Sequence, residues 1–436
     1  MRRDILRAGL CMAAVSALLL GCGRDLPREA DRQQTDVSAA ETRSPEQLEE
    51  ETSEKTEEET KKPSETAVLP EKEEAEIPEK VPEESLEEKI GSILGNMTLE
   101  EKVAQMFIVL PEGLTGAGCV TAAGETTRDA IREVPVGGFI YMEQNLESAS
   151  QVQEMLSNVQ SYSMERIGLP AFTCVDEEGG TVARISGRGN FDVPAIGDMC
   201  EVGASGDPEQ AYMVGKEIGG YLGELGFNVD FAPDADVLSN PENQVVRWRS
   251  FGSDPQLVAE MAAAELKGLR EQGVLGAYKH FPGHGATAGD THEGYACTDK
   301  SLEELQACEL IPFQRGIQEG VPMIMVGHIS LPSVTGDGTP ASLSEVLVTE
   351  VLRNQMGYEG IVVTDAMNMG AVANTYTSAQ AAVPAVSAGV DIILMPMDFY
   401  GAYEGILDAV RNQTISPERI DASLERILRV KLQMME

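Results

Sequence analysis

The sequence predicts an α/β fold, a single (β/α)8 TIM-like barrel, from three observations. Eight short apolar or β-branched runs, each bounded by turn residues, follow one another between about residues 88 and 436. Most are separated by segments long enough for a crossover helix, which is the pattern of a parallel sheet covered on both faces. Polar residues directly follow five of these runs, and a barrel would gather them on one face. The alternative, an open doubly wound sheet, would spread them along an edge at about 4.8 Å per strand.

The elements are expected in the following order. The predicted strands are Met106–Leu110, Gly137–Tyr141, Ala171–Val175, Val229–Ala232, Gly276–Tyr278, Met323–Val326, Gly360–Thr364 and Asp391–Leu394. A helix should open at Thr98, because Glu101 follows at capping-box spacing. Further helices are expected at Pro208–Leu225, Pro255–Gln272, Leu302–Gln318, Ser344–Gln355, Ser378–Ala388 and Pro417–Met434. Pro312 and Pro384 should kink or break two of these helices.

The first 21 residues have the features of a signal peptide. Three arginines precede an apolar stretch from Ala8 to Leu20, which is shorter than the roughly 20 residues that span a bilayer. Gly21 and Cys22 then follow, and this ending resembles a bacterial lipoprotein signal with cleavage before Cys22 and lipidation of its thiol. An ordinary secretory signal or a short anchor is the alternative. We therefore expect an extracytoplasmic protein that is anchored to the cell membrane through a lipid on Cys22.

Residues 22–87 form a predicted linker that is rich in Glu, Lys, Ser, Thr and Pro, with runs such as Glu49–Glu51. Such a segment buries too little apolar surface to fold, so we expect a disordered acidic tether before a catalytic domain at residues 88–436. The formal net charge of −39 argues against a nucleic-acid partner, since phosphate backbones attract basic surfaces. Of seven cysteines, five lie beyond the anchor, which favours free thiols, or at most one or two disulfides. A monomer is expected.

Histidines are the first candidates for chemistry, because histidine changes charge near neutral pH. All four lie in the C-terminal half, and His280, His284 and His292 fall within thirteen residues; the fourth is His328. Asp290 could accept a hydrogen bond from one ring nitrogen of His292 and aim the other at a substrate. A loop hydrogen bond without a catalytic role is the alternative for this pair.

A carboxylate and several donors complete the candidate site. Asp365 directly follows the strand Gly360–Thr364, so it either points into the mouth of the barrel or caps a helix. Lys279 and His280 are clustered donors for hydroxyl or carbonyl groups, and Arg249 is a cation that could bind a carboxylate or an amide oxygen. Asp176 ends the third predicted strand, and Arg184 follows a few residues later. Each could instead belong to a solvated or ion-paired loop. Taken together, a nucleophilic carboxylate, a proton-transfer pair and hydroxyl-binding groups on one face are what glycoside cleavage needs.

Six motifs resemble, in order, the signatures of glycoside hydrolase family 3, and most closely its β-N-acetylhexosaminidase branch of the NagZ type. They are Asp176–Gly180 with Arg184, Arg249–Pro255, Lys279–Gly285, Asp290–His292, Met325–Ile329 with Ala341–Ser344, and Gly360–Met369, and the resemblance covers about residues 88–434. It implies a retaining enzyme on a single barrel, without cofactor or metal. Asp365 would be the nucleophile, His292 the general acid/base and Asp290 its partner. The contacts to N-acetylglucosamine would be Asp176, Arg184, Arg249, Lys279 and His280.

This chain departs from the family pattern at three positions that have no assigned role. Thr181 stands where an arginine is usual, and Ala366 and Asn368 replace acidic or serine-type residues near the nucleophile. Family members that act on glucosides or xylosides generally take their acid/base from a second domain. The presence of Asp290 and His292 here favours the hexosaminidase branch.

Three other functions stay open at this point. A metal-dependent amidohydrolase should carry a His-x-His pair after its first strand, where this chain has Pro111–Gly113, although Asp290, His292 and His328 could bind a metal. A non-catalytic sugar-binding lipoprotein could keep the same fold. A phosphorylase could use the same site, because a neutral histidine repels phosphate less than a carboxylate would. Muropeptides or peptidoglycan ends are the natural substrate hypothesis, but chitooligosaccharides or host glycans would need the same sugar site.

Overall fold

Eight parallel strands form a nearly closed barrel sheet in the part of the chain that the structure, a computed structural model, describes: residues 84–289 and 296–436. The strands are β1 (Phe107–Val109), β2 (Gly138–Ile140), β3 (Phe172–Val175), β6 (Val229–Asp230), β7 (Leu275–Phe281), β9 (Met323–Val326), β11 (Ile361–Thr364) and β12 (Ile393–Leu394). Their order in the sheet is β11-β9-β7-β6-β3-β2-β1-β12, and a parallel bridge between Val363 and Ile392 joins the two edges. The doubly wound alternative is therefore wrong, and all eight predicted strands are confirmed.

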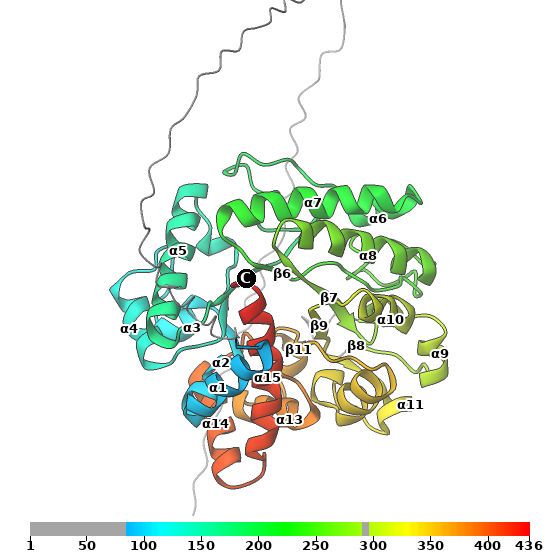
Figure 1. Ribbon diagram of the computed structural model, residues 1–436. Helices are drawn as coiled ribbons and strands as arrows, with labels where there is room; N and C mark the ends of the chain where they lie inside the picture. Colours follow the sequence, from blue (N-terminus) through cyan, green and yellow to red (C-terminus); the bar gives the residue numbers. More distant parts are fainter. Residues whose placement is uncertain (1–83, 290–295) are drawn as a thin grey trace, which may run out of the picture. The chain divides into compact units, whose positions relative to one another are not determined.

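Helices surround this sheet, as Figure 1 shows. They are α1 (Leu86–Asn96), α2 (Leu99–Gln105), α3 (Pro111–Thr115), α4 (Glu125–Glu133), α5 (Ala149–Ile167), α6 (Met199–Ala204), α7 (Pro208–Leu225), α8 (Pro255–Glu271), α9 (Leu302–Gln306), α10 (Leu310–Gln318), α11 (Pro332–Thr335), α12 (Gly370–Ala373), α13 (Ser378–Ala388), α14 (Phe399–Arg411) and α15 (Pro417–Gln433). The predicted capping box is present at α2, where Thr98 and Glu101 bond each other's backbone N–H groups. None of the described helices combines the length and apolarity needed to cross a bilayer.

Smaller elements occupy the connections. Two strands, β4 (Glu177–Gly179) and β5 (Val182–Ala183), form an antiparallel hairpin directly after β3, while β8 (Ala296–Cys297) and β10 (Ile329–Ser330) pair in parallel. Short 3₁₀ turns lie at Glu143–Asn145, His284–Ala286 and Ala341–Leu343. The cysteines of the described residues are all free, as the odd number suggested. The predicted signal peptide, and the predicted linker up to residue 83, lie outside the described residues.

Three helix predictions differ from the structure in detail. The helix expected at Leu302–Gln318 is two helices, α9 and α10, but the break precedes Pro312, which lies in the first turn of α10 where its missing N–H removes no helical bond. Pro384 does not end α13, which continues to Ala388. The helix expected at Ser344–Gln355 is a π-helix at Val346–Gln355.

Close packing of the strands explains the short apolar runs. The residues of β1, β2 and β3 are all buried, since side chains face either the barrel interior or the surrounding helices. In β2 a side chain at Gly138 would bring its Cβ within 2.4 Å of the Phe172 carbonyl oxygen of β3. Only glycine has no side chain to clash at this position, so Gly138 allows β2 and β3 to lie this close.

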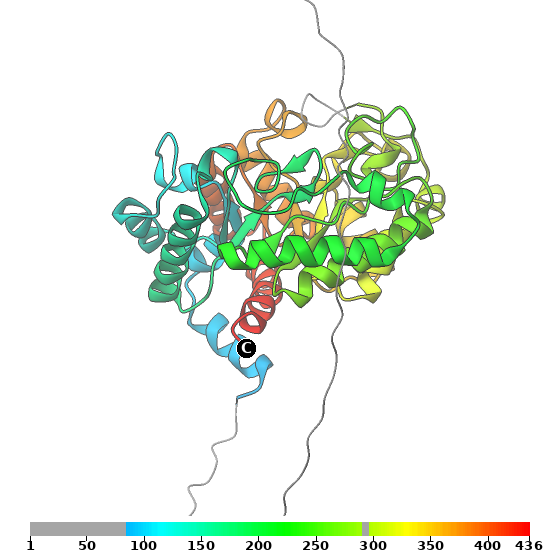
Figure 2. The ribbon, with the colours of Figure 1, turned by 90° about the horizontal axis from the view of Figure 1, so that it is seen from above.

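Helix α15 closes the end of the barrel at which the strands begin. Its Lys431 is fully buried and donates to the Gln105 side chain at 2.8 Å and to the Gly137 carbonyl at 2.7 Å, just before β2. Helix α1 packs on α15 through Ile90 and Leu428, and both helices lie together at this end (Figure 2). The opposite end, where the strands finish, carries the polar residues that the sequence singled out.

Candidate active site

A cavity of about 250 Å³ lies at the carboxyl ends of the strands. The predicted site residues that line it are Asp176, Arg184, Arg249, Lys279, His280 and Asp365. They come from segments after β3, β6 and β11 and from β7 itself, so the barrel gathers all six as expected. The predicted Asp290 and His292 lie outside the described residues. A larger cavity, of about 510 Å³, lies on the outer face between α8 and α10, but it contains none of these residues.

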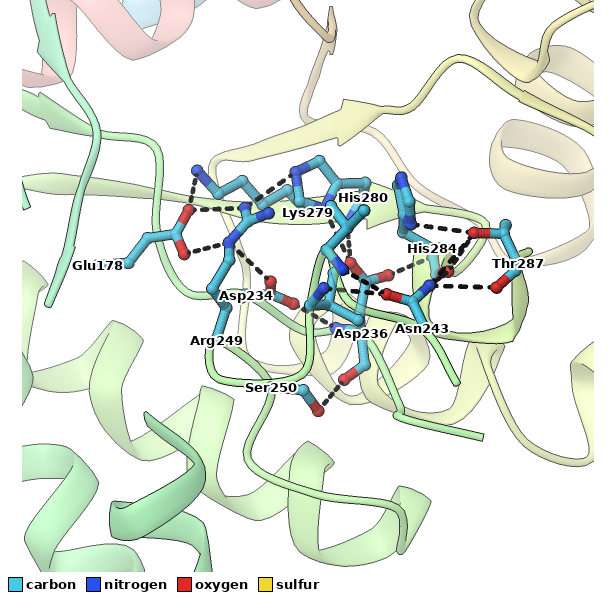
Figure 3. Close-up of polar contacts among 12 residues, drawn as sticks. Glu178, Asp234, Asp236, Asn243, Arg249, Ser250, Lys279, His280, His284 and Thr287 are labelled. Atoms are coloured by element: carbon cyan, nitrogen blue, oxygen red, sulfur yellow. Dashed lines mark hydrogen bonds and ion pairs between the residues drawn. The ribbon is translucent and has the colours of Figure 1, made fainter. Parts of the chain in front are cut away.

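Glu178 organises the cationic side of the cavity (Figure 3). Its carboxylate forms two bonds with Arg249, at 2.7 and 2.8 Å, and an ion pair with the Lys279 ammonium at 2.5 Å. Lys279 also contacts Asp176 at 3.0 Å. Burial alone would raise the pKa of Glu178, but the charges of Arg249 and Lys279 outweigh it and hold the pKa well below its usual range. Two fixed cations are therefore available to oxygen atoms of a ligand.

The same carboxylates keep these two cations charged. Burial would lower the pKa of Lys279, but Asp176 and Glu178 raise it above its usual value. Burial likewise opposes the charge of Arg249, and Glu178 and Asp234 raise its pKa in turn. Glu178 had no role in the sequence-based site, and its position two residues after Asp176 in the same motif was the signal that could have found it.

Asp365 lies at the end of β11 and is 8% exposed. Its Oδ1 accepts a hydrogen bond from the Ala366 N–H at 2.7 Å. Burial would raise its pKa, but the His280 and His328 imidazoles, this N–H bond and the Lys279 ammonium together hold the pKa below its usual value. The next helix, α12, has Met369 as its N-cap, so Asp365 does not cap a helix. An ionised carboxylate therefore faces the cavity.

Two buried histidines stand beside the cations. Nδ1 of His280 contacts Asp236 Oδ2 at 2.8 Å, and its Nε2 lies 3.2 Å from Arg249. His284 Nδ1 contacts the Thr287 hydroxyl at 3.1 Å. Burial, reinforced at His280 by Arg249, lowers the pKa of both histidines to about 4. Both are therefore neutral near pH 7 and cannot serve as the general acid there.

The other predicted positions lie around this centre. Arg184 lines the cavity and its guanidinium is 3.6 Å from Glu143, which places it at the rim. His328 is fully buried; its Nδ1 contacts the Ser342 hydroxyl at 2.8 Å and its Nε2 donates to the Ala366 carbonyl at 3.0 Å. It therefore fixes the segment that follows Asp365.

One cluster has the composition of a metal site but is already engaged in other contacts. Ligand atoms of Asp234, Asp236 and His280 lie within 4.8 Å of one another. Asp234 accepts from the Asp236 N–H at 2.9 Å, and the Arg249 guanidinium lies 3.5 Å from its other oxygen. A fixed guanidinium at this position opposes a second cation, so the cluster is better suited to a hydrogen-bonded network than to a metal.

Glu178→Gln should lower the free energy of unfolding by about 3 kcal/mol near pH 7, because it leaves two buried cations without their partner. The pKa of Glu178 is depressed in the folded state, so this stabilisation is complete above about pH 4.5 and declines as the pH falls toward the lower folded value. Urea unfolding at pH 7 and at pH 3 would measure both effects. Glu165→Gln, in an exposed ion pair with Arg128, is the matched control and should change little. A wild-type stability for Glu178→Gln at pH 7 would contradict this account.

A barrel with an ionised carboxylate and fixed cations at the carboxyl ends of its strands is an arrangement typical of barrel enzymes. The family model described as "Glycosyl hydrolase family 3 N terminal domain" matches residues 98–430, so the chain belongs to glycosyl hydrolase family 3. The family resemblance seen in the sequence is thereby confirmed.

Named relatives and a solved structure agree with this family. The chain is 33% identical over 355 residues to "Beta-hexosaminidase A" of Pseudoalteromonas piscicida, with 74% of this chain and 58% of that protein covered. It is 32% identical over 277 residues to "Beta-hexosaminidase" of Stenotrophomonas maltophilia (strain K279a), with 62% and 78% covered. The structure of a glycoside hydrolase family 3 beta-N-acetylglucosaminidase from Paenibacillus sp. str. FPU-7 matches with a TM-score of 0.73 and 36% identity, covering 78% of this chain and 63% of that one. The chain thus spans less than two thirds of the first relative's length.

Proposed function

We propose that this chain is a retaining exo-β-N-acetylglucosaminidase that hydrolyses terminal β-linked N-acetylglucosamine. The observation that carries the proposal is the ionised Asp365 in a cavity that also presents Arg249 and Lys279. The cavity is smaller than the roughly 300–1,000 Å³ that hold drug-sized ligands, which suits a single terminal sugar. The beta-hexosaminidase names of the relatives support the choice of sugar.

The proposed reaction has two steps. In the first, a carboxylate oxygen of Asp365 attacks the anomeric carbon, the glycosidic C–O bond breaks, and His292 gives its proton to the leaving oxygen. In the second, water attacks the same carbon, the bond to Asp365 breaks, and the water proton returns to His292. Asp290 would orient the imidazole during both steps. This role suits His292 better than His280 or His284, whose pKa values of about 4 keep them neutral.

The remaining residues would hold the sugar during both steps. Donors come from Arg249 and Lys279, which are buried and charged, and from Arg184 at the rim. Asp176 accepts from Lys279 and is partly exposed to the cavity, so it can also accept from a sugar hydroxyl. Fixed donors and acceptors of this kind lower the barrier by holding the reacting carbon over the nucleophile. Ala366 and Asn368, which depart from the family pattern, also line the cavity and could tune which sugar is preferred.

A substrate panel tests the function. We expect the protein to release the aryl group from an aryl β-N-acetylglucosaminide much faster than from the aryl β-glucoside, and to release N-acetylglucosamine from muropeptides. Added phosphate should leave the rate and the products unchanged. A rate that depends on phosphate, with a sugar phosphate as product, would indicate the phosphorylase. No turnover of any glycoside by the folded protein would favour the sugar-binding alternative.

We also propose that the enzyme is extracytoplasmic and lipid-anchored at Cys22, which makes peptidoglycan fragments its natural substrate. The support is the sequence alone: the apolar stretch that ends in Gly21 and Cys22, followed by the acidic residues 22–87. Cys22→Ala should abolish incorporation of a labelled fatty acid into the full-length protein expressed in a bacterium that lipidates such signals. Cys11→Ala, inside the apolar stretch, is the control and should keep the label. Label that survives Cys22→Ala would exclude the lipid anchor.

A further inference from the structure

Asp236 is a fully buried carboxylate in the segment that follows β6. Its Oδ2 accepts from Nδ1 of His280 at 2.8 Å and from the His280 backbone N–H at 3.3 Å. Its Oδ1 accepts from the His284 backbone N–H at 2.5 Å. One side chain thus joins the segment after β6 to the end of β7 and to the turn beyond it, as Figure 3 shows.

The backbone of Asp236 is held as firmly as its side chain. Its N–H donates to Asp234 Oδ1 at 2.9 Å, and its carbonyl accepts from the Ser250 hydroxyl at 2.7 Å. Ser250 directly follows Arg249, so Asp236 is bonded to the segments that carry two proposed sugar contacts, Arg249 and His280. All of these bonds are made within the protein, and Asp236 does not line the cavity.

The two neighbours of the His280 ring determine where its proton lies. Burial raises the pKa of Asp236, and the backbone N–H groups of His284 and His280 and the Arg249 charge oppose this rise and favour the ionised form. An ionised carboxylate can only accept hydrogen bonds. Nδ1 of His280 must then carry the hydrogen in the bond to Asp236. On the other side of the ring Arg249, which can only donate, lies 3.2 Å from Nε2, so that this nitrogen must present its lone pair. An acceptor at one nitrogen and a donor at the other specify the same tautomer.

We propose that Asp236 is a positioning residue that fixes His280 as the Nδ1–H tautomer, so that its Nε2 lone pair accepts from the Arg249 guanidinium and holds that cation, a proposed sugar contact, in place at the cavity. The part that concerns the sugar rests on the proposed function, whereas the tautomer does not. Lys279 and Arg249 supply donors to the cavity, and the Nε2 lone pair of His280 helps to fix the direction of the Arg249 donors. The other tautomer would set an Nε2–H against the Arg249 N–H, and two donors that face each other are costly in a buried site.

Nitrogen NMR of the full chain with ¹⁵N-labelled histidine tests the tautomer directly, because the sequence has only four histidines. The His280 signals are assigned by their loss in His280→Gln. We expect Nδ1 to be protonated and Nε2 unprotonated at pH 7. A proton on Nε2, or on both nitrogens, would overturn the proposal.

Asp236→Asn tests the positioning role. Asparagine keeps one acceptor oxygen, so either His280 or the His284 N–H loses its partner. We expect the pure Nδ1–H signature to be lost and kcat/KM on the aryl β-N-acetylglucosaminide to fall by roughly 10–100-fold, as for a lost hydrogen bond to a charged group. Asp254→Asn, the same change at the exposed N-cap of α8, is the control and should alter neither quantity, because asparagine caps equally well.

The outcomes separate this proposal from the proposed function. If Asp236→Asn is folded and keeps both the wild-type His280 spectrum and the wild-type kcat/KM, Asp236 does not position His280. If the protein cleaves no N-acetylglucosaminide but the wild-type spectrum shows Nδ1–H, the proposed function fails and the tautomer assignment stands. A variant that does not fold is replaced in this test by Ser250→Ala, which releases the Asp236 carbonyl and should broaden the His280 signals; unchanged signals would overturn the positioning role.

Discussion

Asp365→Asn is expected to lower kcat on an aryl β-N-acetylglucosaminide by about 10⁴-fold or more, because a carboxamide cannot form the glycosyl-enzyme. The side chain has nearly the same volume and can still accept from the Ala366 N–H, so the domain should stay folded. Steady-state kinetics together with thermal unfolding would measure both effects.

Asp398→Asn is the matched control for this variant. Asp398 caps α14 through the Gly401 N–H and is exposed, and asparagine caps equally well, so activity should be retained. A loss of less than about 10-fold for a folded Asp365→Asn protein would show that another group is the nucleophile.

His292→Ala is the second large effect, and its size should depend on the leaving group. Hydrolysis of a natural disaccharide should fall by about 10²–10⁴-fold, as for a lost general acid/base. An acidic phenol needs little protonation, so the first step on such a substrate should be relatively spared. The glycosyl-enzyme would then accumulate, and azide should speed turnover because it attacks the anomeric carbon without needing a base.

Asp290→Ala should show a milder version of the same pattern, since Asp290 only orients and polarises the imidazole. The described His280 provides a contrast: because it is neutral and holds a hydrogen bond to Asp236, His280→Ala should impair good and poor leaving groups alike and should show no azide rescue. Equal losses on both leaving groups for His292→Ala, with no azide rescue, would place the acid/base elsewhere.

The strands and the location of the site could be predicted from the sequence because both depend on local patterns. Strands that are buried on both faces must be continuously apolar, and the residue that follows such a strand lies at the carboxyl edge of the sheet. Asp365 and Asp176 were found in this way. The break between α9 and α10 was predicted at the wrong place. A proline in the first turn of a helix removes no backbone hydrogen bond, so the effect of Pro312 depends on where α10 begins.

Partners distant in the chain could not be predicted. Glu178 meets Arg249 across 71 residues, and Asp236 meets His280 across 44. Their pairing follows from which strands are neighbours in the barrel, and no pattern within either segment shows it. That Asp365 does not cap a helix could likewise be seen only in the structure, where α12 begins beyond it, at Gly370.

The most direct test of the central claim is to identify the residue that becomes glycosylated. A fluorinated N-acetylglucosamine substrate that forms the glycosyl-enzyme faster than water releases it should trap the intermediate, and peptide mass spectrometry should locate the label. We predict one label per chain, on Asp365, in the peptide that contains residues 360–369, and none in Asp365→Asn. A label on Asp176 or Asp234, or an active enzyme that inverts the anomeric configuration and forms no adduct, would contradict the account.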